Sequence, residues 1–244
     1  MTRLSVNINK VALLRNSRGG DLPDILRVAM DCETFGAQGI TVHPRPDERH
    51  IRYQDVRDLK SIVHTELNIE GYPDQRFMDL VLDVCPAQCT LVPDLPGVLT
   101  SSEGWDTLTN RTFLTEITSE LNRKGIRVSL FVDPDRYKVE GAAMTGAQRV
   151  ELYTGVYAKK YRSDPESAIR DHVGAAEAAQ TLGLGLNAGH DLNLINLAFY
   201  RSKIPTLLEV SIGHAIVSDA LYYGLSNVVG MYLRCLATGA DISG

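Results

Sequence analysis

Three residues able to transfer protons near neutral pH stand where strands are expected to end. His43 ends the segment GITVH, Glu70 ends ELNIE, and His190 follows GLNA after one glycine. Imidazole titrates near neutrality and can either accept or donate a proton. Partial burial raises the pKa of a carboxyl group and makes it a usable general base in the same range. These residues therefore predict acid–base catalysis.

Basic residues and glycine-containing turns near these positions indicate an anionic substrate. Pro44 ends the strand before it, because it has no N–H for the sheet, and a charged loop with Arg45 and His50 follows. The later turns NAGHD and IGHA follow adjacent strands, and such turns bind phosphate in barrel folds. The pattern predicts a phosphorylated small molecule, although a strand followed by a solvated loop explains residues 44–50 equally well.

The spacing of histidines and cysteines does not indicate a metal site. The sequence contains no H-x-H, H-x-x-x-H or C-x-x-C pair. No lysine stands at a strand end where a Schiff-base aldolase would need one, and Lys10, Lys159 and Lys160 are expected in solvated loops. We therefore expect metal-free acid–base chemistry.

Strand-like and helix-like segments alternate along the whole chain and must position these residues. The expected strands are residues 4–8, 39–43, 66–70, 88–92, 126–132, 149–153, 185–188 and 208–212. The expected helices are residues 24–35, 53–64, 74–84, 111–124, 135–145, 165–182, 192–201 and 215–237, the last in one piece or two. Residues 9–24 are expected as a polar turn, and residues 93–110 and 154–164 as long loops.

Alternating strands and helices are typical of parallel α/β folds. Eight such units can close into a barrel without free edges. The alternative, an open doubly wound sheet, is less favoured because no G-x-G-x-x-G follows the first strand. The sequence predicts a TIM-type (β/α)8 barrel in which residues 1–244 form a single domain.

Polar residues stand at every second position of the expected strands and so share one face of each strand. This pattern predicts a polar barrel interior. Glu66, Arg149 and Glu209 lie near the amino ends, where we expect an internal layer of ion pairs. Asn7 and Glu70 lie at the carboxyl ends, the rim that carries active sites in this fold. A buried polar group without a partner costs about 1–3 kcal/mol, so a polar interior is expected to serve function as well as stability.

The composition is that of a folded protein without a polyanion-binding surface. The chain has 244 residues, 44% of them hydrophobic and 23% charged, and a net charge of −5. We expect no nucleic-acid partner and, since no apolar run has the length of a membrane span, no membrane partner. The four cysteines and the absence of an apolar signal-peptide core near the first residue predict reduced thiols in a cytoplasmic protein.

Seven segments, taken together, resemble a known enzyme family in order and spacing. They are VNINKVALLRNSRG, GITVHPRPDERHI, LNIE, VSLFVD, VELYTGVYA, LNAGHDL and IGHAI. They are similar to the pyridoxine 5′-phosphate synthase family over essentially the whole chain. This resemblance implies a TIM-type barrel, a homo-octamer, and the condensation of 3-amino-2-oxopropyl phosphate with 1-deoxy-D-xylulose 5-phosphate. The products are pyridoxine 5′-phosphate, phosphate and water, and no metal or organic cofactor is implied.

The same resemblance implies roles for individual residues. His43 and Glu70 look like proton acceptors and His190 like a proton donor. The positions that resemble the amino-ketone phosphate site are Asn7, Arg18, Asp191, Gly213 and His214. Those that resemble the deoxyxylulose phosphate site are Asn9, Lys10, Arg45, His50 and Thr100. The 93–110 loop resembles a lid, which would shield imine intermediates from water.

Three positions depart from the family pattern. Asn9 and Lys10 stand where many members have Asp-His, so an amide would bond a sugar hydroxyl and a lysine would attract phosphate. Asp191 stands where glycine is common. A carboxylate there repels phosphate unless it points away and only its backbone N–H is used.

Two other functions remain open on the residues alone. One is another metal-free barrel enzyme, such as an isomerase or epimerase acting on a sugar phosphate. The other is a catalytically inactive barrel that serves as a binding or assembly module. The presence of His43, Glu70 and His190 argues against the inactive barrel.

Overall fold

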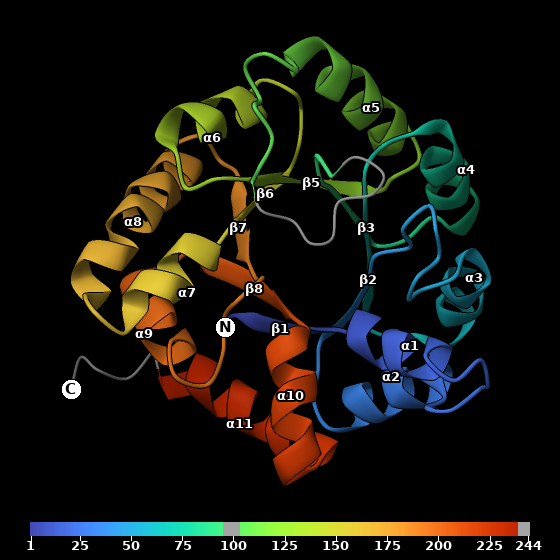
Figure 1. Ribbon diagram of the computed structural model, residues 1–244. Coiled ribbons are helices and arrows are strands. Elements are labelled where there is room, and N and C mark those ends of the chain that lie inside the picture. The colour runs from blue at the N-terminus through green and yellow to red at the C-terminus, as the bar shows by residue number, and fades with distance from the viewer. Residues whose placement is uncertain (95–102, 239–244) are drawn as a thin grey trace.

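Parallel strands close into a barrel in the computed structural model, which describes residues 1–94 and 103–238. The strands are β1 (Arg3–Asn7), β2 (Gly39–Val42), β3 (Glu66–Gly71), β4 (Gln88–Leu91), β5 (Arg127–Val132), β6 (Arg149–Leu152), β7 (Gly185–Ala188) and β8 (Leu207–Ile212). Each pairs with the next in sequence, and β8 pairs with β1 (Figure 1). The predicted barrel is confirmed.

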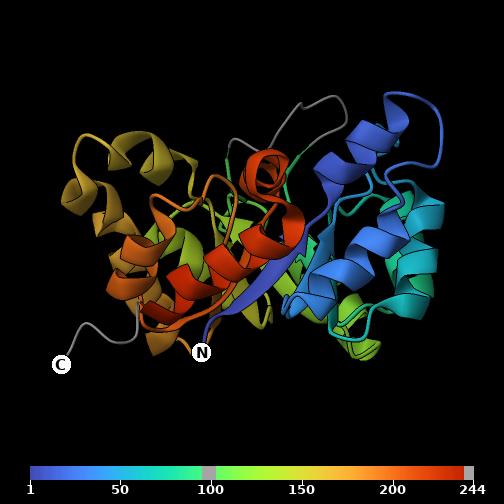
Figure 2. The same ribbon diagram turned by 90° about the horizontal axis from the view of Figure 1, so that it is seen from below.

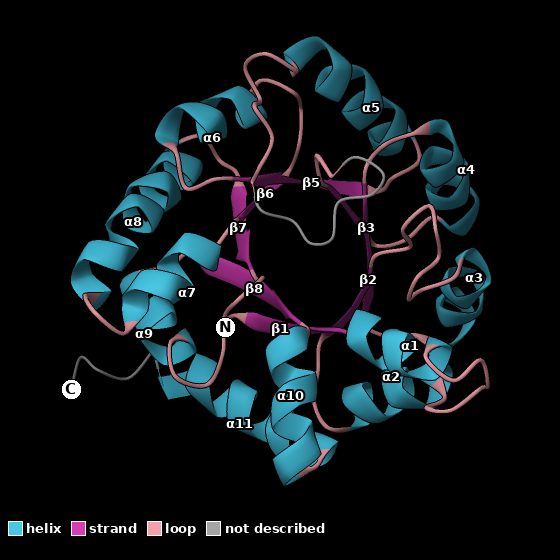
Figure 3. Cartoon of the chain, viewed as in Figure 1, coloured by secondary structure: helices cyan, strands magenta, loops and turns pink. Residues whose placement is uncertain are grey.

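Helices form the outer ring around these strands, as Figure 3 shows. They are α1 (Asn9–Asn16), α2 (Ile25–Thr34), α3 (Tyr53–Ile62), α4 (Gln75–Val84), α5 (Arg111–Arg123), α6 (Arg136–Ala143), α7 (Gly155–Tyr161), α8 (Pro165–Thr181), α9 (Leu197–Lys203), α10 (His214–Tyr223) and α11 (Leu225–Thr238). Several begin at an aspartate whose carboxylate accepts backbone N–H groups, as Asp24 does for α2 and Asp74 for α4. The last helical segment is in two pieces, as predicted, with Gly224 at φ 76° between them.

Two helices occupy segments that the sequence predicted as a turn and a loop. In α1, Val11 and Ala12 are buried. In α7, Tyr157 is fully buried with its ring centroid 5.0 Å from that of Tyr200. Burial of a few apolar groups against the barrel stabilises these short helices, whose sequences carry only a weak periodic pattern. The prediction that Lys10, Lys159 and Lys160 lie in loops was therefore wrong.

The segment after β7 also differs from the prediction. α9 begins at Leu197 rather than near residue 192. Asn193 and Asn196 instead donate side-chain hydrogen bonds to the Asp191 carbonyl oxygen, at 3.2 and 3.3 Å. Asparagine side chains of this kind compete with helix hydrogen bonds and favour turns. The result is a compact turn next to the barrel mouth.

The apolar and polar strand residues separate to opposite sides of the sheet. Ile40, Val42 and Ile69 are fully buried in the hydrophobic core. Among the polar residues that alternate with these along the strands, the hydroxyl groups of Ser5 and Thr41 lie 2.7 Å apart. The Thr90 hydroxyl donates to Asn68 at 3.0 Å. These partners satisfy groups whose burial would otherwise destabilise the fold.

An ion-pair layer occupies the amino ends of the strands. Glu66 pairs with both Arg3 and Arg127, and Nη1 of Arg149 lies 3.5 Å from Oε2 of Glu209. This confirms the predicted internal layer. Figure 2 shows β1 rising from the N-terminus towards α1, so the ion pairs and the α1 end of the barrel lie at opposite ends. Among residues 1–94 and 103–238, no helix has the length and apolar character needed to cross a membrane.

Candidate active site

A cavity of about 660 Å³ opens at the carboxyl ends of the strands. It is lined by the following predicted site residues: Asn7, Asn9, Lys10, His43, Arg45, His50, Glu70, His190, Asp191, Gly213 and His214. Arg49, Glu151, Tyr153, Lys159 and Ser211 also line it. A larger outer groove of about 1010 Å³, between α6 and α8, contains none of the predicted residues. The barrel therefore gathers groups from distant parts of the chain at one mouth.

Two predicted residues are not placed in this cavity. Arg18 lies in the exposed turn after α1 and is not among the lining residues. Thr100 lies outside the residues that the structure describes, as do residues 95–102 of the predicted lid.

Glu70 lies at the carboxyl end of β3 among polar partners. Its Oε2 atom lies 3.4 Å from Nδ2 of Asn7 and 4.0 Å from Nδ1 of His43, and Ser211 donates to Oε1 at 3.4 Å. Burial raises the pKa of Glu70 to about 7. The carboxyl group can therefore accept and release a proton near neutral pH.

His43 follows β2, and its imidazole faces the Glu70 carboxyl group. Burial, with the positive charge of Arg45, lowers the pKa of His43 well below its ordinary value. Its backbone N–H donates to Oδ1 of Asn9 at 2.9 Å. Asn9 thus anchors the end of β2 to the start of α1. A neutral imidazole next to a carboxyl can accept a proton from a substrate.

A second buried carboxyl, Glu151, lines the same cavity from β6. Burial, followed by the charges of Glu70 and Glu209, raises its pKa well above the ordinary value. Sequence parity placed Glu151 on the barrel interior, but its position before the strand end did not single it out. The signal that could have identified it is an acidic residue at an interior position one residue before the end of its strand. Like-charged neighbours favour one protonated and one ionised carboxyl.

Positive groups gather on the β2 side of the cavity. Arg45 forms a buried ion pair with Asp94 at 2.8 Å. Burial and the charge of Arg45 lower the pKa of His50 to about 4, and Lys10 contributes to the same shift. The crowded cations disfavour a further proton on His50 and favour a bound anion.

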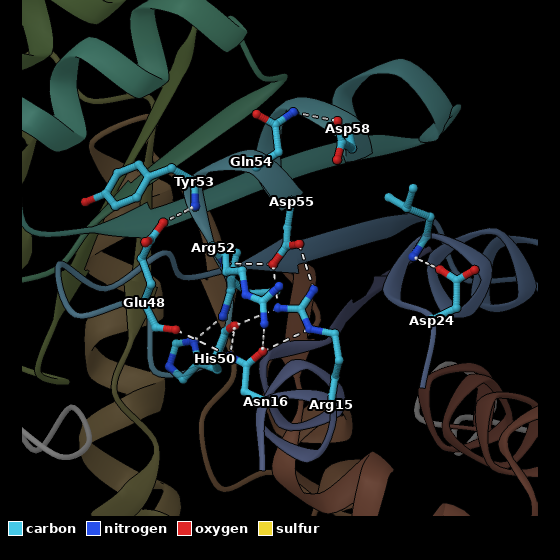
Figure 4. Close-up of polar contacts among 12 residues, drawn as sticks. Arg15, Asn16, Asp24, Glu48, His50, Arg52, Tyr53, Gln54, Asp55 and Asp58 are labelled. Atoms are coloured by element: carbon cyan, nitrogen blue, oxygen red, sulfur yellow. Dashed lines mark hydrogen bonds and ion pairs between the residues drawn. The ribbon is translucent and has the colours of Figure 1, made fainter. Parts of the chain in front are cut away.

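Residues that the sequence did not single out hold His50 in place (Figure 4). Nη1 of Arg15 lies 2.7 Å from Asp55, and Nη2 of Arg15 donates to the His50 carbonyl oxygen at 3.2 Å. Asn16 donates to the same oxygen at 2.7 Å. These contacts join α1, the β2–α3 loop and α3 into one unit.

The turn after β7 carries His190 and Asp191. Nδ1 of His190 lies 3.1 Å from Oδ2 of Asp191. The hydrogen bond with His190 lowers the pKa of Asp191. The Tyr153 ring packs edge-on against the imidazole, with centroids 5.5 Å apart. The Asp191 side chain is therefore directed at a histidine in the structure.

The N-terminus of α10 supplies backbone donors to the cavity. Gly213 is its N-cap and His214 its first residue. A Cβ at Gly213 would lie 2.8 Å from the Asn7 carbonyl oxygen, so β8 and β1 approach too closely there for a larger residue. Unsatisfied N–H groups and the helix dipole favour an anion at this point.

Comparisons with known proteins agree on fold and family. A phosphoribosyl anthranilate isomerase structure from Thermotoga maritima covers 97% of this chain and 99% of its own, with a TM-score of 0.63 and 13% identity. That similarity shows the fold alone. A pyridoxine 5'-phosphate synthase from Cytophaga hutchinsonii is 62% identical over 96% of this chain and 98% of its own length. One from Flavobacterium johnsoniae is 60% identical over 97% of this chain and 100% of its own.

The family model described as pyridoxal phosphate biosynthesis protein PdxJ matches residues 4–238. The match includes Glu70 at the end of β3 and the turns that carry His43 and His190. The chain therefore belongs to the PdxJ family.

Proposed function

We propose that this barrel is a pyridoxine 5′-phosphate synthase, which condenses 3-amino-2-oxopropyl phosphate with 1-deoxy-D-xylulose 5-phosphate. The products are pyridoxine 5′-phosphate, phosphate and water. Relatives that are about 60% identical over nearly the whole chain carry that name. The observation that carries the chemistry is a buried Glu70 with a pKa of about 7 beside a histidine whose pKa is lowered.

The proposed catalytic roles follow from these protonation states. The amine attacks the ketone of the deoxyxylulose phosphate and forms an imine. Glu70 and His43 then accept protons as phosphate is lost and water adds, and His190 donates a proton during ring closure and dehydration. Glu151 lies in the same cavity, and its raised pKa suits a protonated carboxyl that donates a hydrogen bond to developing negative charge. These four side chains lie in one cavity and exchange protons with one another, so their titrations are coupled.

The proposed phosphate positions lie on two sides of the cavity. The amino-ketone phosphate is assigned to the N-terminus of α10 with Gly213 and His214, near Asn7. The deoxyxylulose phosphate is assigned to Lys10, Arg45 and His50, with Asn9 bonding a hydroxyl. Arg18 and Thr100 keep their assignments from the family resemblance as part of this proposal.

The cellular setting of the enzyme is also a proposal. A homo-octamer follows from the resemblance and is supported by large exposed apolar side chains such as Leu221 and Tyr222. A cytoplasmic location is supported by Cys32, Cys85, Cys89 and Cys235, all of which are free thiols. The proposed reaction uses no metal or organic cofactor.

Mixing the protein with both phosphates tests the proposal directly. A pyridine chromophore should appear with the two substrates together and with neither alone. No chromophore with both would overturn the proposal. Conversion of the deoxyxylulose phosphate alone into an isomeric sugar phosphate would instead favour the isomerase alternative.

A further inference from the structure

The side chains of Asp191 and His190 are in contact within the cavity. Oδ2 of Asp191 lies 3.1 Å from Nδ1 of His190, and the two side chains are 44% and 26% exposed. A carboxylate only accepts hydrogen bonds, so a hydrogen bond along this contact requires the imidazole proton on Nδ1. Nε2 is then the nitrogen left to exchange a proton with a bound molecule.

The backbone around this pair is braced on both sides. Thr154 donates to the Gly189 carbonyl oxygen at 2.8 Å. The Asp191 carbonyl oxygen accepts from Asn193 and Asn196. A Cβ at Gly189 would lie 2.4 Å from the Ser211 carbonyl oxygen, so this backbone is pressed against β8. His190 has a positive φ of 20°, a conformation that the surrounding contacts must hold.

Charged and titratable groups on four other elements face the pair. Lys159 on α7 and His214 on α10 act on Asp191 and, after the larger effect of His190, lower its pKa. Glu70 on β3 interacts with the charge of His190, and Tyr153 after β6 contacts its ring. The Asp191 carboxylate therefore stays ionised near neutral pH, with the Lys159 ammonium as a nearby positive charge.

We propose that Asp191 is a positioning residue for His190, which orients the imidazole and fixes its proton on Nδ1 so that Nε2 meets the substrate. The inference rests on the proposed function for its catalytic meaning. It agrees with the expectation that the Asp191 side chain points away from phosphate, and it adds a role for that side chain. It also accounts for a carboxylate close to a phosphate site, because the negative charge faces His190 and Lys159. Carboxylate partners orient catalytic and ligand histidines in this way in other proteins.

The tautomer of His190 provides the test, because it is measured without substrate. NMR of the protein with isotopically labelled histidine reports which ring nitrogen carries the proton, and His190→Gln identifies the signal among the six histidines. In the wild-type protein the neutral ring should carry its proton on Nδ1. In Asp191→Gly the Nε2–H form should predominate, and Asp191→Asn, which keeps an acceptor oxygen, should fall between. An unchanged tautomer in Asp191→Gly would overturn the proposal.

Turnover of the same variants supplies the second readout. Asp191→Gly should lower kcat about tenfold or more while KM for either phosphate changes little. A raised KM with unchanged kcat would show that Asp191 contacts phosphate and would refute the positioning role. Asp83→Asn, which breaks a surface pair with Arg57, serves as the control and should change neither the tautomer nor kcat. If no variant and no wild-type protein turns over, the proposed function fails while the tautomer still decides the positioning role.

Discussion

At Glu70, the burial that suits the proposed activity also lowers the stability of the folded protein. The Glu70 carboxyl is withdrawn from water, and within residues 1–94 and 103–238 it contacts the side chains of Asn7, His43 and Ser211. Burial therefore raises its pKa to about 7 from the ordinary 4.5. The same property that makes Glu70 a base near neutral pH makes its ionised form unfavourable in the folded protein.

Glu70→Gln should abolish turnover and stabilise the protein only at higher pH. Since the folded-state pKa lies above the unfolded value, the favourable contribution of Glu70 is complete below the unfolded pKa. It is lost as the pH rises through about 7. Above that pH, the free energy of unfolding of the variant should exceed that of the wild type by about 1–3 kcal/mol. Denaturant unfolding at acidic and alkaline pH measures the difference; an equal difference at both would contradict the assigned pKa.

At the scale of the elements, a buried ion pair determines where His50 lies. The Arg15 and Asp55 side chains are 7% and 13% exposed, and Asp55 also accepts the backbone N–H of Arg52 at 2.7 Å, at the start of α3. The pair thus joins α1 to α3 and encloses the β2–α3 loop, as Figure 4 shows.

Asp55→Ala should destabilise the protein strongly, by about 3–5 kcal/mol, because it leaves the buried Arg15 without its partner. Asp31→Ala is the matched control. It breaks the exposed Arg27–Asp31 pair, whose side chains are 70% and 32% exposed, and should cost less than about 1 kcal/mol. Urea unfolding of both variants gives the comparison. Similar losses for the two would show that the pair does not join the helices.

At the scale of the whole molecule, two neighbouring helices of the outer ring, α1 and α10, expose apolar side chains to water. Leu221 and Tyr222 of α10 are 77% and 83% exposed, and Leu14 of α1 is 55% exposed. Contiguous apolar surface on a protein commonly marks a contact with another chain. The proposed octamer would cover surface of this kind.

The native mass in solution should be eight times that of the 26.9-kDa chain. Light scattering after size exclusion, at several concentrations, measures it. Leu221→Glu combined with Tyr222→Glu should lower the mass and preserve the far-ultraviolet circular dichroism spectrum, because both side chains lie outside the folded core. A monomeric wild type would contradict the octamer and leave the barrel itself unaffected.

The order of elements and the presence of His43, Glu70 and His190 at one barrel mouth could be predicted from the sequence. The alternation of polar and apolar residues showed which strand residues face the barrel interior, because alternate side chains of a strand point to opposite faces. It separated Val42 and Ile69, which are buried under the helices, from His43 and Glu70. The amino-end ion pairs followed from the same rule.

Helices α1 and α7 could not be predicted, because their stability comes from burial against elements that are distant in sequence. The pKa of Glu70 depends on enclosure by several strands, and the Arg15–Asp55 pair depends on the packing of α1 against the loop before α3. Asp191 shows the division most clearly. The sequence determined that a carboxylate stands beside His190, and only the folded turn directed that carboxylate at Nδ1, because direction is set by backbone contacts and not by residue type.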